Sequence, residues 1–275
     1  MKVTIVTISY NQAVFLEKTI LSVLSQDYTN IEYIVVDPGS TDGSRELIAK
    51  YRKKIDQIIF EPDNGPADGL NKGFHAATGD IFGYLNSDDI LLPNAVSQIV
   101  QAFHKASKVS VISGHGMMID ANGYALKRVY SHRFNLKTYA YGACVLVQPA
   151  SFFGRDQFFQ VGGFNSLNHV SWDGELWVDL ALKGAKFSRI HSCLAGFRVH
   201  RNSITGSGKF EAEIQKQHAR ICQKTGIDPR SNLRRKVIWA LHRLSDPKTT
   251  AARMFDGLRN RHLMESFPPD GTLAA

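Results

Sequence analysis

The chain has 275 residues, of which 43% are hydrophobic and 21% are charged. This is the composition of a globular protein with one large or two small domains, and it excludes a disordered or collagen-like chain. No apolar run approaches the roughly 18 residues that a membrane span needs, and the run at 3–8 is too short for a signal peptide. We therefore expect a cytoplasmic protein. Three cysteines without CxxC spacing indicate neither a disulfide framework nor a thiolate zinc site.

The net charge of +8 is concentrated near the C-terminal end. Residues 209–275 hold 13 Lys and Arg against 7 Asp and Glu, whereas residues 1–208 hold 20 against 18. Attraction to an anionic partner is therefore expected in the basic segment. A nucleic-acid-binding protein would carry its cations among aromatic residues on the folded core, so we expect no nucleic-acid partner.

The first 90 residues alternate apolar strands with amphipathic helices. We predict strands at 3–8, 31–36, 58–60 and 80–86, and helices at 13–26, 44–54 and 67–77. This order implies right-handed crossovers and an α/β fold, Rossmann-like, with a mainly parallel sheet and helices on both faces. Such sheets bind ligands at the carboxyl ends of their strands, so the polar loops there are expected to meet. The loops contain Ser9-Tyr10-Asn11, Asp37, the segment 61–68 and Asp88-Asp89.

Beyond residue 90 the pattern changes to a small antiparallel extension. We predict a helix at 94–105, strands at 109–113 and 196–200, an acidic helix at 172–182, and a hairpin over 117–130 that turns at Asn122-Gly123. From residue 209 the chain is predicted to be helical, with interruptions at Pro229 and Pro247. No GxGxxG follows the first strand and no GxxxxGK[ST] occurs, which argues against a dinucleotide fold and a P-loop.

Asp88 and Asp89 follow a buried strand, and this position suggests more than a solvated acidic pair. One carboxylate can bind a hard divalent cation such as Mg²⁺ or Mn²⁺ while the other accepts from a ligand hydroxyl. Such a cation would carry substrate phosphates. Asp37, directly after four apolar residues, can accept from the ring N–H of a base, whereas Asp42 is better explained as a helix cap.

Six motifs, in order and at family spacing over residues 1 to about 205, resemble the family 2 glycosyltransferases of the GT-A fold. They are Thr7-Ile8-Ser9-Tyr10-Asn11, Val35-Val36-Asp37-Pro38-Gly39-Ser40-Thr41-Asp42-Gly43-Ser44, Asp68-Gly69-Leu70-Asn71-Lys72-Gly73, Ala77-Thr78-Gly79-Asp80, Asn86-Ser87-Asp88-Asp89 and Val161-Gly162-Gly163-Phe164. The resemblance implies a GT-A catalytic domain at 1–208, with a nucleotide-sugar-binding half (1–90) and an acceptor-side half (91–208). A basic helical extension would follow at 209–275.

The same resemblance implies a function in bacterial surface polysaccharide assembly. The expected reaction is an inverting transfer of a hexose from a nucleotide diphosphosugar, usually UDP-linked, to a saccharide or a lipid-linked saccharide, for example one that is carried on a polyprenyl diphosphate. A divalent cation, Mn²⁺ or Mg²⁺, would bind the diphosphate. The alternative enzyme class, a sugar-1-phosphate nucleotidyltransferase, should show a glycine-rich phosphate loop with Arg and Lys after the first strand, which Ser9-Tyr10-Asn11-Gln12 lacks.

Carried over position by position, the resemblance implies a set of donor-binding residues and a metal site. The donor-binding residues would be Thr7, Ser9, Tyr10, Asn11, Asp37, Asp68, Lys72 and Asp88, with Asp37 at the base and Asp88 near the ribose. Asp89 would be the metal ligand, and His200 matches a histidine that often reaches the metal or the diphosphate. Pro38 stands where many members have a second aspartate, so UDP is the family preference and is not specified by these residues.

Asp173 matches the aspartate that looks like the catalytic base of the family. An inverting displacement needs one carboxylate to accept the proton of the acceptor hydroxyl, which supports this assignment independently. The alternative is that Asp173 is a helix N-cap. Trp172 replaces a glutamate of the family, and Trp172, Glu175 and Gln148 lie in the segment that shapes the acceptor side.

The basic segment contains a candidate amphipathic helix. Val237, Leu241 and Leu244 share one helical face, and Arg234, Arg235, Lys236 and Arg243 lie beside them. Such a helix is typical of peripheral binding to an anionic membrane surface, here the inner face of the cell membrane. The alternative is that the apolar stripe packs on the catalytic domain.

Overall fold

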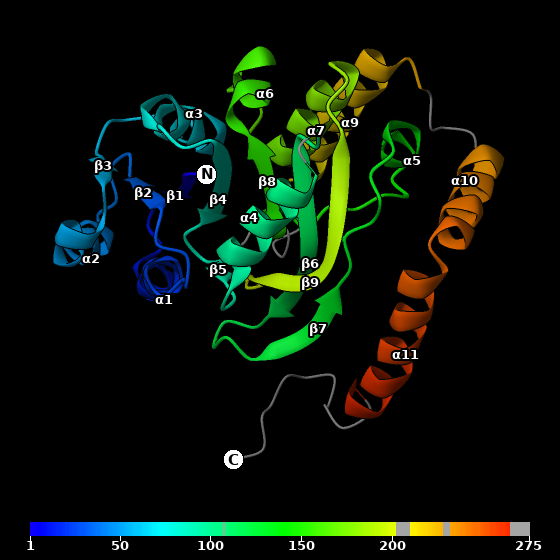
Figure 1. Ribbon diagram of the computed structural model, residues 1–275, viewed down its shortest axis with the longest axis horizontal. Helices are drawn as coiled ribbons and strands as arrows, with labels where there is room; N and C mark the ends of the chain where they lie inside the picture. Colours follow the sequence, from blue (N-terminus) through cyan, green and yellow to red (C-terminus); the bar gives the residue numbers. More distant parts are fainter. Residues whose placement is uncertain (107, 202–209, 228–231, 265–275) are drawn as a thin grey trace.

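The computed structural model describes residues 1–106, 108–201, 210–227 and 232–264 (Figure 1). The first part alternates strands and helices as predicted: β1 (Val3–Ile8), α1 (Ala13–Leu24), β2 (Ile31–Val36), α2 (Ser44–Lys50), β3 (Gln57–Ile59), α3 (Pro66–Ala76) and β4 (Ile81–Asn86). There follow β5 (Ile90–Leu91), α4 (Ala95–Lys105), β6 (Val111–Ile119), β7 (Ala125–Val129), α5 (Leu136–Ala140), β8 (Ser151–Gly154) and α6 (Arg155–Gln160). The last elements are α7 (Trp172–Leu182), β9 (Phe187–Arg198), α9 (Glu211–Thr225), α10 (Asn232–Ser245) and α11 (Pro247–Met264).

One mixed sheet runs through the described residues, in the order β3-β2-β1-β4-β8-β6-β9-β5 with β7 paired to β6. The four strands of the N-terminal half are parallel to one another. β8 is antiparallel to β4 and to β6, and β9 returns parallel to β6. The carboxyl ends of β1, β2 and β4 therefore lie at one edge of the sheet, where the predicted polar loops begin.

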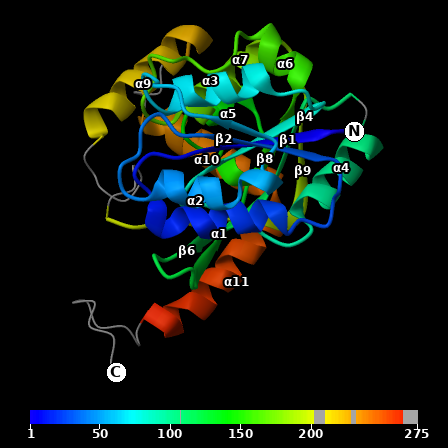
Figure 2. The ribbon, with the colours of Figure 1, turned by 90° about the vertical axis from the view of Figure 1, so that its left-hand side faces the viewer.

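Apolar layers cover both faces of this sheet (Figure 2). On one face, α1, α2 and α4 bury side chains such as Leu16, Ile48 and Ile99. On the other face, α3, α6 and α7 bury a cluster rich in aromatic residues that includes Phe74 and Phe158. These layers fix the direction of each strand and hence the position of the loops at its end.

The antiparallel half differs from the prediction in several strands, since the strand expected at 196–200 is the longer β9, and β8 was not expected. The expected strands at 109–113 and 117–120 form one long strand, β6. A Cβ on Gly114 would lie 2.4 Å from Leu194, and one on Gly116 would lie 2.6 Å from Val147, so these glycines let neighbouring side chains pack closely against β6. The predicted hairpin is confirmed, because β6 and β7 pair and Gly123 N donates to Asp120 O at 3.1 Å.

Two helices are shorter than predicted. α1 ends at Leu24, and α2 ends at Lys50 and is followed by a 3₁₀ turn at Arg52–Lys54. The N–H of Tyr51 reaches Ile48 O at 3.1 Å, three residues back, which tightens the end of the helix. A second 3₁₀ turn, Gln148–Ala150, precedes β8.

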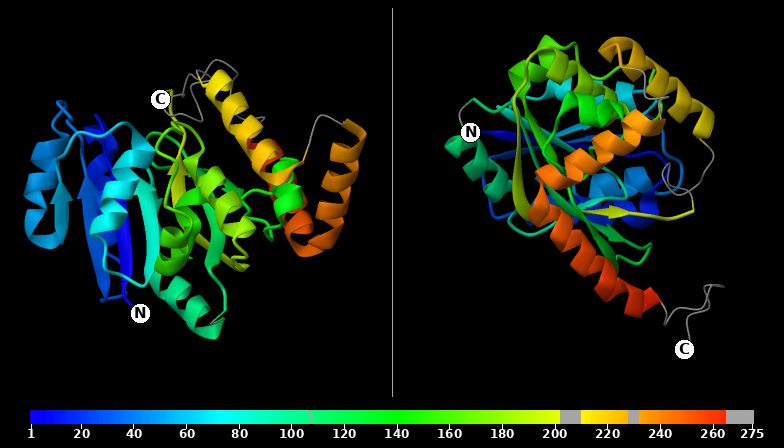
Figure 3. Two further views of the ribbon diagram at one scale, coloured as in Figure 1. Left: turned by 90° about the horizontal axis from the view of Figure 1, so that it is seen from above. Right: turned by 90° about the vertical axis from the view of Figure 1, so that its right-hand side faces the viewer.

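The C-terminal helices contact the catalytic fold (Figure 3). Ile221 of α9 packs with Val178 of α7, and Asp246, between α10 and α11, forms an ion pair with Arg189 of β9. The predicted break at Pro247 is confirmed, whereas the predicted boundary at 208/209 and the break at Pro229 lie outside the described residues. Within the described ranges, none of the helices has both the length and the apolar character needed to cross a bilayer.

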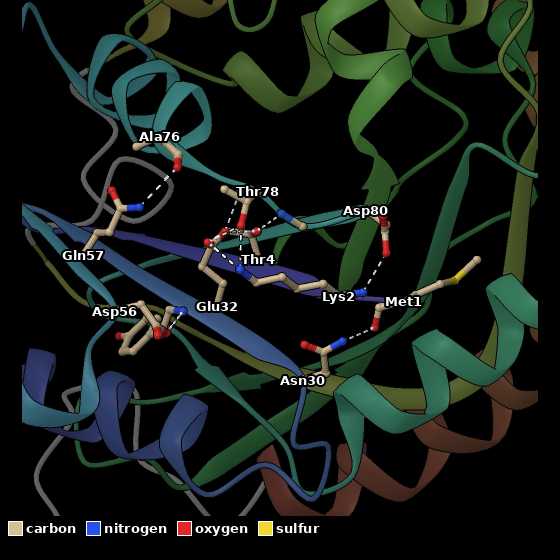
Figure 4. A network of polar contacts seen from close by, with 12 residues as sticks. Met1, Lys2, Thr4, Asn30, Glu32, Asp56, Gln57, Ala76, Thr78 and Asp80 are labelled. Carbon is tan, nitrogen blue, oxygen red and sulfur yellow. Dashed lines mark hydrogen bonds and ion pairs between the residues drawn. The ribbon is translucent and has the colours of Figure 1, made fainter.

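A buried carboxylate joins β1, β2 and the loop that precedes β4 (Figure 4). Glu32 accepts hydrogen bonds from Lys2 Nζ at 2.8 Å, from Thr4 Oγ1 at 2.6 Å, and from the backbone N–H and hydroxyl of Thr78 at 2.7 and 2.6 Å. Burial alone would raise the pKa of Glu32, but these hydrogen bonds outweigh it and lower the pKa to about 2.

We predict that Glu32→Gln destabilises the fold by about 2 kcal/mol at pH 7, because hydrogen bonds to a charged acceptor are lost. Since the folded-state pKa is depressed from 4.5 to about 2, this stabilisation is complete above pH 4.5 and is lost as the pH falls toward 2. Urea unfolding of both proteins between pH 7 and pH 2.5 should show the difference shrinking. Glu61→Gln, at an exposed position, is the control, and a difference that is independent of pH would contradict the assignment.

Candidate active site

A cavity of about 720 Å³ lies at the edge of the sheet where the polar loops meet. Its polar lining comes from the loop after β1, the loop before α3 and the turn after β4. The 3₁₀ turn Gln148–Ala150 and the first turn of α7 complete it. These residues include Ser9, Tyr10, Asp63, Asp88, Asp89, Gln148 and Asp173. The expectation that the strand-end loops converge is therefore confirmed, and the acceptor-side segment is brought to the same cavity.

The two aspartates after β4 differ in their surroundings. Asp89 is 4% exposed, and its carboxylate accepts from Arg198 N at 3.0 Å and from Asn86 Nδ2 at 3.2 Å. Asp88 lies 3.0 Å from His200, measured from Oδ2 to Nε2. Burial raises the pKa of Asp89 well above its usual range, and the neighbouring charge of Asp88 raises it further. The ionised form of Asp89 is thus disfavoured unless a cation lies beside it.

The residue types suit a divalent cation. His200 contacts Asp88, whereas Asp89 accepts from Arg198 N and Asn86, so the three residues do not place one ligand atom each within 4.8 Å of one another in this structure. Their mixture of oxygen and nitrogen ligands suits Mn²⁺ or, through the carboxylates, Mg²⁺. A cation would also relieve the repulsion between Asp88 and Asp89. Asp88, Asp89 and His200 are the residues that would hold it.

Arg198 holds the acidic turn in place. Its guanidinium donates to Asp88 O at 2.9 Å and to Asp120 O at 2.8 Å, and it lies 4.9 Å from the ring centroid of Phe15. The ring of His200 lies 4.7 Å from the same phenyl ring. Phe15 therefore supports both residues, and Arg198 has the structural role of a buried arginine.

Asp37 has one occupied and one unoccupied carboxylate oxygen. Oδ1 accepts from Gly39 N at 3.1 Å, from Ser40 N at 2.8 Å and from Arg45 Nε at 3.1 Å. Oδ2 is buried and has no hydrogen-bond partner among the described residues. A buried acceptor without a donor is costly unless a ligand supplies one, such as the N–H of a base. Asp42 caps α1 and α2, as predicted, by accepting from Ala13 N and Ser44 N.

The predicted residues at the end of β1 and in the loop after it have three different roles. Ser9 and Tyr10 line the cavity. Asn11 adopts a left-handed conformation with φ 51°, and it bonds Ser40 and Thr41, so it fixes the loop. The structure does not bring Thr7 to the cavity lining, because its fully buried hydroxyl accepts from Tyr33 O–H inside the core.

Asp68 and Lys72 hold a loop and are not among the cavity-lining residues of the described chain. Asp68 accepts from Asn64 N at 2.9 Å, and Lys72 Nζ donates to Pro62 O. The loop that they hold presents Asp63 to the cavity, and burial raises the pKa of Asp63. Sequence reasoning missed Asp63, for which the only signal was its position within the polar segment 61–68.

Asp173 occupies the first turn of α7 and is half-buried in the cavity wall. Burial raises the pKa of Asp173 to about 6, although the N–H of Gly174 works in the opposite direction. The N-cap of α7 is Ser171, with φ 47°, so the alternative of Asp173 as the N-cap is wrong. A carboxylate with a pKa near neutrality suits proton transfer at physiological pH.

The other acceptor-side residues are placed differently from one another. Trp172 and Gln148 line the cavity, and Gln148 Nε2 donates to Tyr84 O at 3.0 Å. Glu175 is 1% exposed and is absent from the lining that the described residues form. Its carboxylate accepts from Asn165 and Asn168, each at 3.0 Å, and pairs with α9 through Arg220 at 3.2 Å and Lys224 at 2.9 Å. This corrects the expectation for Glu175, which ties α7 to α9.

Tyr84 was not predicted, because it lies within an apolar strand. It lines the cavity, and burial together with the nearby Asp173 carboxylate raises its pKa. The phenol is therefore protonated and can donate a hydrogen bond beside Asp173.

A second cluster, His132, Cys144 and His242, has its ligand atoms within 4.8 Å of one another. His132 Nδ1 accepts from Val145 N–H at 2.9 Å, which places the ring proton on Nε2. Neither nitrogen of His132 then offers a free lone pair. The cluster therefore packs α10 against the domain, with the two imidazole rings 4.6 Å apart, and it does not have the chemistry of a metal site.

Comparison with known proteins assigns the family. The model of glycosyl transferase family 2 matches residues 4–159. An uncharacterized glycosyltransferase of Nostoc sp. is 38% identical over 44% of this chain, and the match spans 38% of that relative's length. The putative teichuronic acid biosynthesis glycosyltransferase TuaG of Bacillus subtilis is 29% identical over 76% of this chain and 83% of its own length.

Solved structures agree on the fold. S. aureus TarS 1-349, crystallised with UDP-GlcNAc, superposes with a TM-score of 0.67 at 17% identity, over 88% of this chain and 71% of TarS 1-349. The mannosyltransferase PcManGT from Pyrobaculum calidifontis, in complex with GDP-Man and Mn²⁺, gives a TM-score of 0.65 at 17% identity, over 98% of this chain and 81% of its own. With the GT-A fold and the family match over more than half of its residues, the chain belongs to glycosyl transferase family 2.

Proposed function

We propose that this glycosyltransferase is metal-dependent and inverting, and that it moves a hexose from a nucleotide diphosphosugar to a saccharide acceptor in surface polysaccharide biosynthesis. One observation carries the proposal: the aspartate pair Asp88-Asp89 lines the same cavity as Asp173, a carboxylate with a pKa of about 6. The similarity to TuaG, a putative enzyme of teichuronic acid biosynthesis, supports a function in surface polysaccharide biosynthesis. The complexes of TarS with UDP-GlcNAc and of PcManGT with GDP-Man and Mn²⁺ support the use of a nucleotide sugar and a divalent cation.

The donor is proposed to be UDP-linked and to lie along the strand ends. Asp37 Oδ2 would accept the N–H of the base, because it is buried without another donor among the described residues. Ser9 and Tyr10 would contact the nucleotide, and Asp88 would lie near the ribose. Asn11, Asp68 and Lys72 would act on the donor through the loops that they hold. A Mn²⁺ or Mg²⁺ ion on Asp89, with Asp88 and His200 beside it, would neutralise the charge that develops on the leaving diphosphate.

Asp173 is proposed to act as the general base. It would accept the proton of the acceptor hydroxyl while that oxygen bonds to the anomeric carbon and the bond from this carbon to the diphosphate oxygen breaks. Attack from the face opposite the leaving group inverts the anomeric configuration. Trp172 and Gln148 would form the acceptor side of the cavity, and the Tyr84 hydroxyl would orient the attacking group by a hydrogen bond.

The acceptor is proposed to be linked to a polyprenyl diphosphate and to be met at the inner face of the cell membrane, with the enzyme in the cytoplasm. A sugar-1-phosphate nucleotidyltransferase is not favoured, since the loop after β1 has no glycine-rich phosphate site. The positions of Asp173 and Trp172 at the cavity suit glycosyl transfer to a second sugar.

We predict that Asp173→Asn lowers the turnover number about 100-fold or more and leaves donor affinity unchanged, because size is kept and proton acceptance is lost. The turnover number is measured as the release of nucleoside diphosphate, with a panel of UDP- and GDP-sugars, lipid-linked acceptors and Mn²⁺. The wild-type rate should rise as the pH increases through about 6, where Asp173 ionises, and this limb should be absent in the variant. Asp156→Asn, at an exposed position, is the control. A near wild-type rate for Asp173→Asn would exclude Asp173 as the base.

We also predict that Glu175→Gln lowers the turnover number about 10-fold with little change in KM, because α9 no longer holds the first turn of α7, where Asp173 lies. Loss of the buried charged acceptor should destabilise the fold by about 2 kcal/mol. Asp179→Asn removes only the more exposed partner of Lys224 and should cost at most about 0.5 kcal/mol. Equal kinetics for Glu175→Gln and Asp179→Asn would contradict the positioning role of Glu175.

A further inference from the structure

Helix α10 has an inner face that docks on the domain. His242 is 6% exposed, and Trp239 Nε1 donates to Tyr141 O at 3.1 Å. At the end of the helix, Asp246 pairs with Arg189, whose side chain is 3% exposed. These contacts fix the rotation of α10 about its axis, and with it the direction of the opposite face.

The opposite face is apolar and exposed. Leu233 is 74% exposed, Val237 49%, Leu241 60% and Leu244 75%. Their spacing of four, four and three residues places them on one side of the helix, roughly 16 Å long at 1.5 Å per residue. We call these four residues the outer stripe. Among the residues that the structure describes, Val237, Leu241 and Leu244 therefore do not pack their stripe on the α/β domain, which was one of the two alternatives.

The charged residues of α10 that lie beside the outer stripe are all positive. By helical position, Arg234 lies on one side of the stripe, and Lys236 and Arg243 lie on the other. The sequence of α10 contains no Asp or Glu. A continuous apolar stripe of this kind, with cations on both sides, is typical of a helix that lies in the plane of an anionic membrane interface.

Charge complementarity favours lipid over a second copy of the chain as the partner of the outer stripe. A second copy of the chain would bring the cations of one α10 close to those of the other, without an acidic residue on either helix to offset them. Anionic headgroups supply the opposite charge along both sides of the stripe, and the acyl boundary accepts the leucines. Each cation near such a surface raises partitioning about fivefold, and salt weakens this attraction.

We propose that the outer stripe of α10 lies on an anionic lipid bilayer and holds the enzyme at the membrane. The purpose of this contact rests on the proposed function, in which a lipid-linked acceptor is presented at that surface. The contact itself depends only on α10 and on lipid charge. Vesicle binding therefore tests it separately from sugar transfer.

The experiment is sedimentation of the full chain with vesicles of phosphatidylcholine containing 30% phosphatidylglycerol. We expect binding at least 10-fold stronger than to phosphatidylcholine alone, and at least 10-fold weaker in 500 mM than in 50 mM NaCl. Leu241→Ser with Leu244→Ser should weaken binding at least 10-fold, as should Lys236→Glu with Arg243→Glu. The melting temperature of the serine variant should not change, because both leucines are exposed.

The matched control reverses charges elsewhere on the surface. Arg52, Lys53 and Lys54 are exposed beside α2, at the opposite end of the molecule from α10 in Figures 1 and 3. Their replacement by Glu should leave vesicle binding unchanged. Equal loss in the control and the α10 variants would show non-specific charge attraction and overturn the proposal, as would absence of wild-type binding.

Sedimentation equilibrium without lipid tests the alternative that a second copy of the chain covers the outer stripe. A wild-type dimer that the serine variant converts to monomer, together with no vesicle binding, would assign the stripe to self-association and overturn the membrane role. Donor binding and nucleoside diphosphate release, measured on the same variants without lipid, should stay at the wild-type level. Loss of vesicle binding with retained transfer separates failure of this inference from failure of the proposed function.

Discussion

The burial of one carboxylate beside another, at the end of β4, is the constraint on which the rest of the site depends. Asp89 is removed from water next to Asp88, and its charge is disfavoured there. The surroundings fix this turn without neutralising it: Thr19 Oγ1 donates to Ser87 O and Asp89 O at 2.7 Å, and Arg198 donates to Asp88 O. A turn held in this way, in which the charged form of Asp89 lacks a compensating cation, is preorganised for one.

The same constraint explains why distant parts of the chain meet at the cavity. Arg198 and His200 come from β9 and the residues after it, more than 100 positions beyond Asp88, and Phe15 of α1 supports both. The second half of the sheet therefore helps to hold the turn after β4 as well as lining the cavity. α9 continues this pattern, because Arg220 and Lys224 engage Glu175 two residues from Asp173.

Sequence patterns predicted the features that depend on local order. Strand–helix alternation located β1 to β4, and the polar residue after each strand located Asp37, Asp88 and Asp89, because parallel strands end at one edge. Residues whose roles depend on long-range packing were harder to predict from the sequence. Asp68 and Lys72 turn toward a loop, Glu175 meets a helix 45 residues away, and Tyr84 is a cavity residue inside an apolar strand. The outward direction of the α10 stripe also required the structure, because periodicity shows that a face exists and not what it contacts.

The central claim is that Asp89 and Asp37 mark the two ends of a metal-bound nucleoside diphosphate. Diffraction from crystals soaked with UDP and Mn²⁺, with anomalous data that locate manganese, tests it most directly. The account predicts an anomalous peak within about 2.5 Å of an Asp89 carboxylate oxygen. It also predicts the uracil N–H within hydrogen-bond reach of Asp37 Oδ2. Manganese at another site, or UDP bound with Asp89 still contacting only Arg198 and Asn86, would contradict the account.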